Sequence, residues 1–408
     1  MRNRKVVIVS ACRTPIGEFM GQFKDVPARE LAITAAHAAL ARIGLDAKQV
    51  DELVMGEVFC AMQGSLPARQ VSMRIGMNPA SGALSVNQNC ASGMRALEIV
   101  SNDILLGKAE IGLAVGVESM TQAPFLLPKA RMGYHFGSVP DRGRAELYDS
   151  LICDGLHDEL SDGHMGATAE TVAKRYQITR QECDEFALLS HRRASEATAS
   201  GKFKREVVPV AVRKGKQTLQ IDTDEHILHD CTEEYFSRFK PAFAADGVVT
   251  IANSSGINDG ASAAVLMSAE KALELGLRPM AELVGCGTRG IEPEIMGLGP
   301  AVAIPAVLRS AGVDFQDIDY WEINEAFAAQ FIGVRKKLQE DCGYAIDVNC
   351  VNANGSGISL GHPVGSTGLR LIVTMLYEME RRNAMLGCAS LCVGGGPAIA
   401  SVWSRRDL

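Results

Sequence analysis

Three continuous apolar runs along the chain predict strands. They are VVIVSA from residue 6, IGLAVG from residue 111 and ASLCVG from residue 389. A run without alternating polar residues is typical of a strand buried on both faces, as in a sheet that helices cover on both sides. Segments with apolar residues at helical spacing separate these runs, so the pattern predicts a layered α/β fold.

The chain also contains an internal repeat. The segment AALARIGLDAKQVDELVMGEV (38–58) matches AVLRSAGVDFQDIDYWEINEA (306–326) at a constant offset of 268 positions. The shared positions are Ala38, Leu40, Gly44, Asp46, Asp51 and Glu57, which meet Ala306, Leu308, Gly312, Asp314, Asp319 and Glu325. Each copy reads as a helix that stops at a glycine and leads into a short strand. Two such copies predict pseudo-symmetric halves, with equivalent strand-to-helix turns beside a shared cleft.

The rest of the chain suggests a domain division. Residues 121–240 have no counterpart in the second half and contain loops rich in Gly, His and Asp. We predict an N-terminal half formed by residues 1–120 plus 241–276, an inserted loop domain at 121–240, and a C-terminal half at 277–408.

Composition and charge narrow the class of protein. With 47% hydrophobic and 22% charged residues the chain is typical of a globular protein, and no segment approaches the roughly 18 apolar residues of a membrane span. The formal net charge is −7 and the Lys and Arg residues are scattered, which argues against a nucleic-acid partner. Eleven cysteines, an odd number, and the absence of a signal-peptide pattern favour a reducing cytoplasm. We expect no metal, because the chain has no C-x-x-C or H-E-x-x-H motif.

Cys90 is the first candidate for chemistry. It lies in SVNQNCASGMRALEIV, at a predicted turn from strand to helix. The N-terminal amides and the dipole of that helix would stabilise a thiolate, which is the nucleophilic form of cysteine. The alternative is a small buried cysteine with a packing role.

Two further candidates lie in the second half. His362 stands in a glycine-rich turn before a helix, near the point equivalent to Cys90, so the repeat would bring the two side chains together. A histidine there could take the thiol proton and point a nitrogen at an acyl oxygen, although a loop histidine bonded to the backbone is the alternative. Cys392 ends a predicted buried strand before three glycines; alone it would be interpreted as a core residue.

Together these segments resemble the thiolase family over essentially the whole chain. NCASGMRA matches the nucleophile segment of that family. The other similar segments, in the family's order, are GVESMTQAPF (116–125), HMGATAETVA (164–173), NSSGINDGASA (253–263), EINEAFAAQ (322–330), GHPVGSTG (361–368) and LCVGGG (391–396). The resemblance implies a thiolase-like fold and an acyltransferase that catalyses reversible coenzyme A-dependent thiolysis of a 3-oxoacyl-CoA.

The resemblance also implies roles for individual residues. Cys90 would accept the acyl group as a thioester, His362 would activate it, and Cys392 would act as acid and base at the α-carbon. Two oxyanion holes are implied: one from His362 with a water held by Asn324, the other from the N–H groups of Cys90 and Gly394. The implied contacts with coenzyme A or the acyl group are Leu156, His164, Met165, Ser255, Met296 and Phe327.

Partners follow from the same resemblance. Acyl-CoA and coenzyme A are substrates, and no cofactor is required. The family is usually dimeric or tetrameric, so we expect a homodimer or homotetramer that buries the face near the nucleophile strand. Features of short-chain and long-chain branches occur side by side, which leaves the length, branching and aromaticity of the acyl group open.

Three alternatives stay open at this point. One is a 3-oxoacyl synthase of the same superfamily, which Cys392 in its glycine-rich turn argues against. Another is a non-catalytic coenzyme A-binding scaffold subunit of a multienzyme complex, which the presence of Cys90, Asn324, His362 and Cys392 argues against. The third is a thiolase that needs a further partner subunit.

Overall fold

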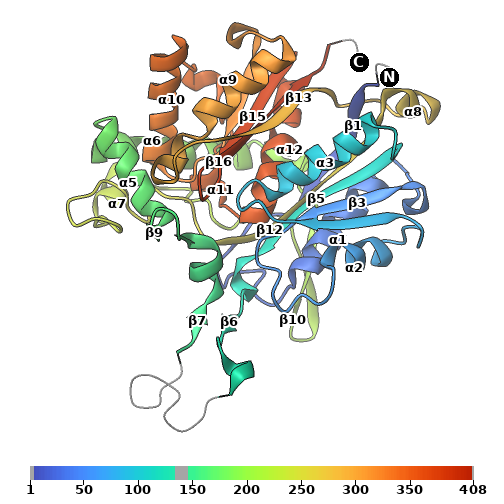
Figure 1. The fold of residues 1–408 in the computed structure, drawn as a ribbon, viewed down its shortest axis with the longest axis horizontal. Coiled ribbons are helices and arrows are strands. Elements are labelled where there is room, and N and C mark those ends of the chain that lie inside the picture. Colours follow the sequence, from blue (N-terminus) through green and yellow to red (C-terminus); the bar gives the residue numbers. More distant parts are fainter. Residues whose placement is uncertain (1–3, 134–145, 407–408) are drawn as a thin grey trace.

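The computed structural model describes residues 4–133 and 146–406 (Figure 1). In the first part of the chain the elements are β1 (Val6–Arg13), β2 (Gly17–Glu18), α1 (Ala28–Ala41), β3 (Glu52–Gly56), α2 (Pro67–Arg74), β4 (Gly82–Val86), α3 (Ser92–Leu105) and β5 (Ile111–Ser119). The residues between β5 and β12, 120–257, are called the middle segment. After it follow β12 (Asn258–Ser268), α8 (Ala269–Glu274), β13 (Ala281–Gly290), α9 (Pro300–Ala311), β14 (Tyr320–Ile323), α10 (Ala328–Cys342), α11 (Gly357–Leu360), α12 (Val364–Arg382), β15 (Leu386–Cys392) and β16 (Pro397–Ser404).

One mixed sheet runs through the molecule in the order β14-β15-β16-β13-β1-β12-β5-β3-β4, with β2 paired to β12. Its two sides match outward from the central β1·β13 pair. On one side β12 and β5 are antiparallel and β5 and β3 parallel; on the other, β16 and β15 are antiparallel and β15 and β14 parallel. The pseudo-symmetric halves predicted from the repeat are therefore present.

Helices cover the sheet on both sides and also lie between its halves. α3 and α12 pack against each other in the middle. α3 contacts strands of the N-terminal half, such as β3 and β5, and α12 contacts strands of both halves, such as β5 and β15. α1 covers β12 and β5, and α9 covers β13 and β16 (Figure 1). α12 is buried from Val364 to Met379. The predicted runs form β1, β5 and β15, which are buried at every position. The layered α/β fold predicted from the sequence is confirmed.

The two copies of the sequence repeat also share backbone conformations and hydrogen bonds. Both predicted glycine stops adopt the left-handed conformation that favours glycine, with φ of 63° at Gly44 and 65° at Gly312. Asp51 accepts hydrogen bonds from the N–H groups at the start of β5, and Asp319 accepts the same bonds at the start of β15. These bonds make Ile111 equivalent to Leu386. β15 is therefore the counterpart of β5, and it begins three residues before the ASLCVG run.

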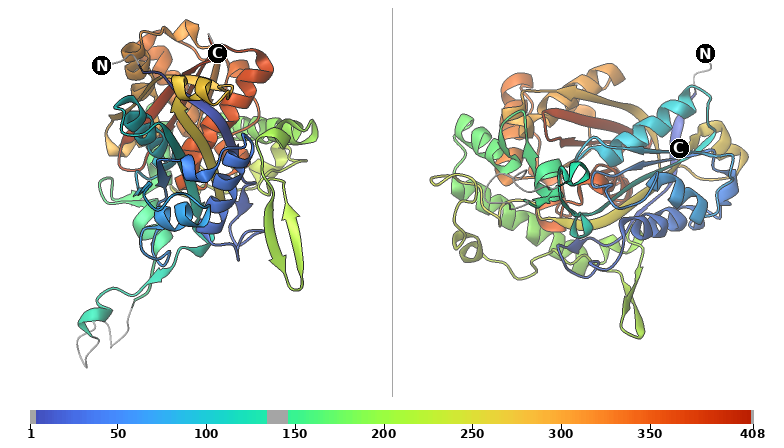
Figure 2. Two further views of the ribbon diagram at one scale, coloured as in Figure 1. Left: turned by 90° about the vertical axis from the view of Figure 1, so that its right-hand side faces the viewer. Right: turned by 60° about the horizontal axis from the view of Figure 1, so that its bottom comes forward.

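The middle segment adds helices and two projections. It contains β6 (Phe125–Leu126), β7 (Tyr148–Asp149), β8 (His157–Asp158), β9 (Gly163–His164), α5 (Met165–Arg175), α6 (Arg180–Ala199), β10 (Val210–Lys214), β11 (Gln217–Ile221) and α7 (Glu233–Ser237). α5 and α6 pack on α10 of the C-terminal half. The β6–β7 arm and the β10–β11 hairpin extend from the body (Figure 2). Residues 134–145 of the predicted insert lie outside the described residues, and the three-part domain division stays a prediction.

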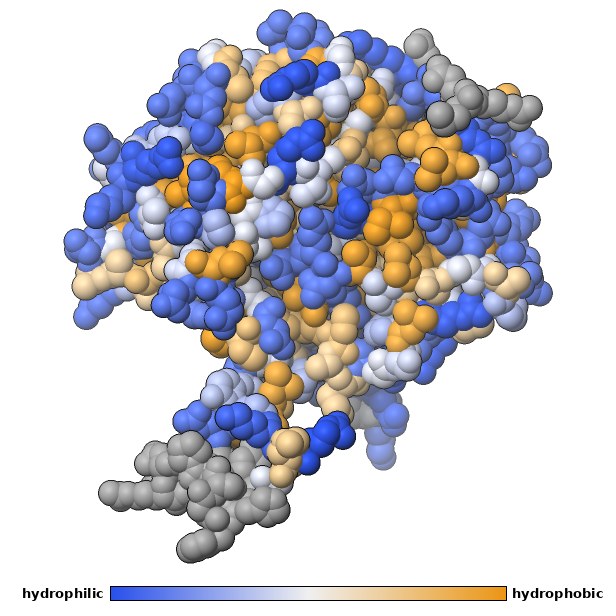
Figure 3. All heavy atoms as spheres, in the orientation of Figure 1, coloured by the Kyte–Doolittle hydropathy of each residue, from blue (hydrophilic) through white to orange (hydrophobic). Residues whose placement is uncertain are grey.

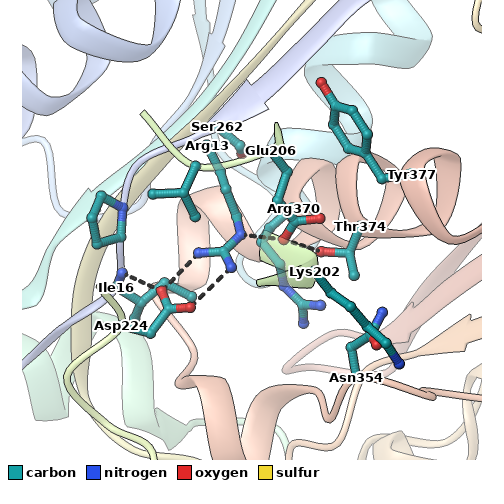
Figure 4. Close-up of polar contacts among 12 residues, drawn as sticks. Arg13, Ile16, Lys202, Glu206, Asp224, Ser262, Asn354, Arg370, Thr374 and Tyr377 are labelled. Carbon is teal, nitrogen blue, oxygen red and sulfur yellow. Dashed lines mark hydrogen bonds and ion pairs between the residues drawn. The ribbon is translucent and has the colours of Figure 1, made fainter. Parts of the chain in front are cut away.

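A buried ion-pair cluster connects the middle segment to β1 (Figure 4). The guanidinium of Arg13 donates to both carboxylate oxygens of Asp224, at 2.7 and 2.9 Å, and its Nε donates to Glu206 at 2.7 Å. Asp224 also accepts the N–H of Ile16 at 2.9 Å. The side chains of all three charged residues are at most 2% exposed, so this network fixes where the insert meets the sheet.

No helix within the described ranges is long and apolar enough to cross a membrane.

Candidate active site

A pocket of about 550 Å³ opens where the two halves and the middle segment meet. Its lining brings together residues that are far apart in the sequence. Of the residues predicted from the sequence, Cys90, His362, Cys392, Gly394, Leu156, His164, Met165, Ser255, Met296 and Phe327 all line it. Asn324 does not line the pocket; it directly follows β14.

Cys90 stands in the turn between β4 and α3, as predicted. The preceding Asn89 has a left-handed backbone, with φ of 45°. Ser92 fixes the turn, because its hydroxyl accepts the N–H of Gln88 at 2.9 Å and donates to the carbonyl of Asn89 at 2.7 Å. Cys90 is consequently half-buried with its side chain at the pocket wall.

Burial and backbone hydrogen bonds act in opposite directions on the pKa of the Cys90 thiol. Burial raises the pKa of the Cys90 thiol to about 11, and hydrogen bonds from the backbone of Gly394 and of Cys90 itself offset that rise only in part. The backbone N–H groups thus favour the thiolate, as expected for a helix N-terminus, but burial of the sulfur outweighs them in the free protein. Cys90 needs a base to become a nucleophile.

His362 can supply that base. It precedes α12 just as Cys90 precedes α3, and its N–H donates to Oδ1 of Asn258 at 2.9 Å. Its Nδ1 lies 2.7 Å from the hydroxyl of Thr367, which donates its own proton to the carbonyl of Pro363 at 3.0 Å. This arrangement assigns the imidazole proton to Nδ1, and the buried Nε2, which has no partner among the described residues, carries a lone pair.

The protonation state of His362 follows from its surroundings. Burial, and secondly the charge of Arg370, lower the pKa of His362 to about 3. The imidazole is neutral at neutral pH, so it can accept a proton rather than having to lose one first.

Cys392 and Gly394 form the opposite wall. Cys392 ends β15, and burial, followed by the neighbouring Cys90, raises the pKa of its thiol, so that the side chain holds its proton. A Cβ at Gly394 would lie 2.3 Å from Cε of Met165, so a side chain there would require Met165 to move. The glycine turn thus lets a backbone N–H approach the Cys90 sulfur.

Asn324 is fully buried, and within the described part of the chain neither its Oδ1 nor its Nδ2 has a hydrogen-bond partner. A buried amide without partners is rare in native proteins and calls for a water or ligand. This is the property expected of a residue that holds a water.

The middle segment supplies the remaining wall. His164 caps α5 by accepting the N–H of Gly166 at 3.0 Å, and its ring stacks on Phe243 with centroids 4.7 Å apart. Phe243 meets Phe327 edge to face. Leu156 ends the π-helix Ile152–Leu156, and the N–H of Ser255 donates to the carbonyl of Ala326 at 2.9 Å. The wall is mostly apolar, which suits a thioester and its pantetheine arm.

Several lining residues were missed at the sequence level. Phe59, Met120 and Phe243 form apolar wall, and Glu18 and His226 form a polar corner with 3.5 Å between Oε1 and Nδ1. Asn89 was missed as well, although an asparagine beside a nucleophile at a sharp turn is a recognisable signal for a left-handed backbone. The other five had no local signal, because only the tertiary fold places them here.

A pair of buried carboxyl groups lies beneath the nucleophile turn. Glu118 accepts the N–H groups of Val58, Phe59 and Gly365. Burial and the neighbouring Glu57 raise the pKa of Glu118 to about 8, and burial raises that of Glu57 to about 7. The pair ties the ends of β3 and β5 to the start of α12.

In the part of the chain that the structure describes, no group of three or more His, Cys, Asp or Glu side chains is arranged to hold a metal ion.

Known proteins match the chain from end to end. The thiolase N-terminal domain matches residues 6–270 and the thiolase C-terminal domain residues 277–405. An acetyl-CoA acetyltransferase of Cupriavidus necator is 45% identical over 98% of this chain and 99% of the relative. A solved acetyl-CoA acetyltransferase of Syntrophomonas wolfei has a TM-score of 0.95 at 50% identity, covering 98% of this chain and 99% of its own. Human mitochondrial 3-ketoacyl-CoA thiolase, solved in complex with CoA, has a TM-score of 0.92 at 36% identity, with 98% of each chain covered.

The chain belongs to the thiolase family. It is an acyltransferase of the thiolase type, and the predicted thiolase activity is confirmed. The two domain matches set aside the 3-oxoacyl synthase alternative.

Proposed function

We propose that the chain catalyses reversible thiolysis of a 3-oxoacyl-CoA through an acyl thioester on Cys90. The observation that carries the proposal is the convergence of Cys90, His362, Cys392 and Gly394 on one pocket. Relatives named acetyl-CoA acetyltransferase and 3-ketoacyl-CoA thiolase support the substrate class.

The first half-reaction breaks a carbon–carbon bond. Nε2 of His362 takes the Cys90 thiol proton, and the sulfur attacks the 3-oxo carbon of the substrate. The N–H groups of Cys90 and Gly394 stabilise the resulting oxyanion. When the bond between C2 and C3 breaks, the electron pair remains on the acetyl-CoA fragment, and the Cys392 thiol returns a proton to C2.

The enolate of acetyl-CoA also needs stabilisation. Nε2 of His362 carries the thiol proton at this stage, so it can donate to the enolate oxygen together with a water on Asn324. The unpartnered amide of Asn324 and the unpartnered Nε2 support this role. In the second half-reaction the Cys392 thiolate takes the proton of coenzyme A, whose sulfur attacks acyl-Cys90 and frees the enzyme.

We further propose that residues 121–240 bind coenzyme A. His164, Met165 and Leu156 at the pocket, with Ser255 facing them, support this role, as does the relative solved with CoA. No cofactor beyond the substrates takes part. All eleven cysteines, which lie within the described residues, are free thiols; this supports a cytoplasmic location.

We propose that the chain is a homodimer or homotetramer. β4, which leads to Cys90, is the last strand of the sheet, and Leu84 on it is 46% exposed. An open edge of this kind favours pairing with a second copy. Apolar side chains also lie at the base of the β6–β7 arm, where Phe125 is 66% exposed (Figure 3). Light scattering at micromolar concentration tests this, and a monomer would refute it.

The experiment that tests the function is a thiolysis panel. Acetoacetyl-CoA and longer, branched and aromatic 3-oxoacyl-CoAs are incubated with coenzyme A and either the wild type or Cys90→Ser. We expect consumption of at least one substrate by the wild type, and a loss of about 10³-fold or more in the variant, because a serine hydroxyl is a far weaker nucleophile. A fully active Cys90→Ser enzyme would refute the mechanism.

A further inference from the structure

Asn89 makes a contact that its own turn does not need. The hydrogen bonds that hold the turn come from its neighbours, since Oδ1 of Asn87 accepts the N–H of Asn89 and the Ser92 hydroxyl donates to its carbonyl. The side-chain amide of Asn89 is therefore available for another partner. Its Nδ2 donates to the carbonyl oxygen of Gly394 at 3.2 Å, across 305 positions of sequence.

This bond joins the two halves at a run of glycines. Gly394 begins a run of three glycines, of which Gly395 and Gly396 have φ of 86° and 104°. A glycine run has many accessible backbone conformations, so its peptide planes rotate unless something fixes them. The bond from Asn89 and the Cε of Met165 above Gly394 are contacts that restrict this segment.

The orientation of Gly394 matters because its backbone hydrogen-bonds to the Cys90 sulfur. An oxyanion-hole donor is effective only when it is aimed before the charge develops. The left-handed φ of Asn89 sets the direction of its side chain toward Gly394 and, at the same time, the direction of the next residue, Cys90. One residue thus places the nucleophile and the facing donor relative to each other.

We propose that Asn89 is a positioning residue: its side-chain amide holds the Gly394 carbonyl so that the Gly394 N–H stays aimed at the Cys90 sulfur and at the oxyanion formed there. This inference rests on the proposed function, in which Cys90 is the nucleophile. The residue itself does not touch the reacting atoms.

The test compares two substitutions. Asn89→Gly keeps the left-handed backbone but removes the amide, and Asn89→Asp keeps the shape but replaces the donor by an acceptor that the Gly394 carbonyl repels. We expect kcat for thiolysis to fall about 10-fold in Asn89→Gly and further in Asn89→Asp, with KM within about 2-fold, since only transition-state donation is weakened. Asn383→Gly is the matched control, because Asn383 is a left-handed asparagine on the surface at the end of α12; it should leave kcat unchanged.

A second readout separates positioning from a structural role. The rate at which iodoacetamide alkylates Cys90, followed by peptide mass spectrometry across pH, reports the pKa of the thiol without any need for thiolysis. We expect that pKa to rise by about half a unit in Asn89→Gly, because a hydrogen bond to the thiolate is weakened. Failure of the wild type in thiolysis would refute the proposed function while alkylation still decides the role of Asn89.

Two results would overturn the inference. One is a kcat and a Cys90 alkylation profile in both Asn89 variants that match the wild type within about 2-fold. The other is a fall in kcat accompanied by an unchanged alkylation profile and a matching loss of folded protein, which would make Asn89 a structural residue only.

Discussion

The Arg13 cluster and the active-site pocket are both buried and polar, but they differ in how their polar atoms are paired. In the cluster, Oε2 of Glu206 alone lacks a hydrogen-bond partner among the described residues. Every guanidinium nitrogen of Arg13 donates to a carboxylate or carbonyl oxygen, and both oxygens of Asp224 accept. In the site, Nε2 of His362 and both amide atoms of Asn324 have no partner in residues 4–133 and 146–406. Paired buried charges hold the middle segment on the sheet, whereas unpaired buried polar atoms cost stability and are retained for a substrate or water.

This comparison predicts a separation of effects. Changes in the pocket should reduce turnover and leave stability intact, whereas changes in the cluster should reduce stability and leave the turnover of folded molecules intact.

The largest effect is expected for His362→Asn. Loss of the base should reduce kcat/KM for thiolysis by about 10³- to 10⁴-fold, because general acid–base catalysis contributes up to that much. The free energy of unfolding should stay within about 1 kcal/mol of wild type, since the asparagine amide can replace Nδ1 in its contact with Thr367 and Nε2 has no partner among the described residues. His37→Asn, on the exposed face of α1, is the control. A loss of activity that merely tracks a loss of folded protein would contradict the comparison.

Asp224→Asn should act in the opposite sense. Arg13 would keep its charge in a buried place with one carboxylate removed, which typically costs about 3–5 kcal/mol of stability. Denaturant unfolding measures this, and kcat per folded molecule should change by less than about 2-fold. Asp341→Asn removes an exposed partner of Lys337 and should cost less than about 1 kcal/mol. Equal losses in the two variants would show that the cluster does not stabilise the insert.

Asn324→Ala should have the next largest effect on kcat. We expect kcat to fall about 10²-fold, the effect of removing one oxyanion-hole donor, without a loss of stability. If His362 and Asn324 serve the same oxyanion, the double variant should lose less than the sum of the two single losses. Simple additivity in thiolysis assays would contradict a shared hole.

The smallest effect concerns pH. The pKa of Glu118 is about 8 in the folded protein, above its ordinary value of 4.5, so the folded state holds a proton that the unfolded state has released. This contribution to stability is complete below about pH 4.5 and is lost as pH rises through about 8. Glu118→Gln cannot lose that proton and should flatten the fall in stability between these two pH values. Identical pH slopes in urea unfolding would argue against a protonated Glu118.

The sequence predicted what the repeat and the local motifs encode. The offset of 268 positions identified the paired helix–strand units, and the structure adds that Asp51 and Asp319 play the same role in both. It also predicted that Cys90 and His362 would approach each other, because their helices occupy equivalent places in the two halves.

The remaining features depend on contacts that no local pattern announces. Arg13 and Asp224 are 211 positions apart, and Asn89 and Gly394 are 305 apart. The burial that raises the pKa of the Cys90 thiol was not predicted, for the same reason. A helix N-terminus can be read from a short segment, but the burial that outweighs it comes from the whole fold.

The most direct test of the account is the mass of the protein after brief incubation with acetyl-CoA. The proposed mechanism predicts an acetyl group on Cys90 that a chase with coenzyme A removes, and no such group in Cys90→Ser. An unmodified Cys90, or an acetyl group that forms equally in Cys90→Ser, would contradict the claim that Cys90 carries the acyl group.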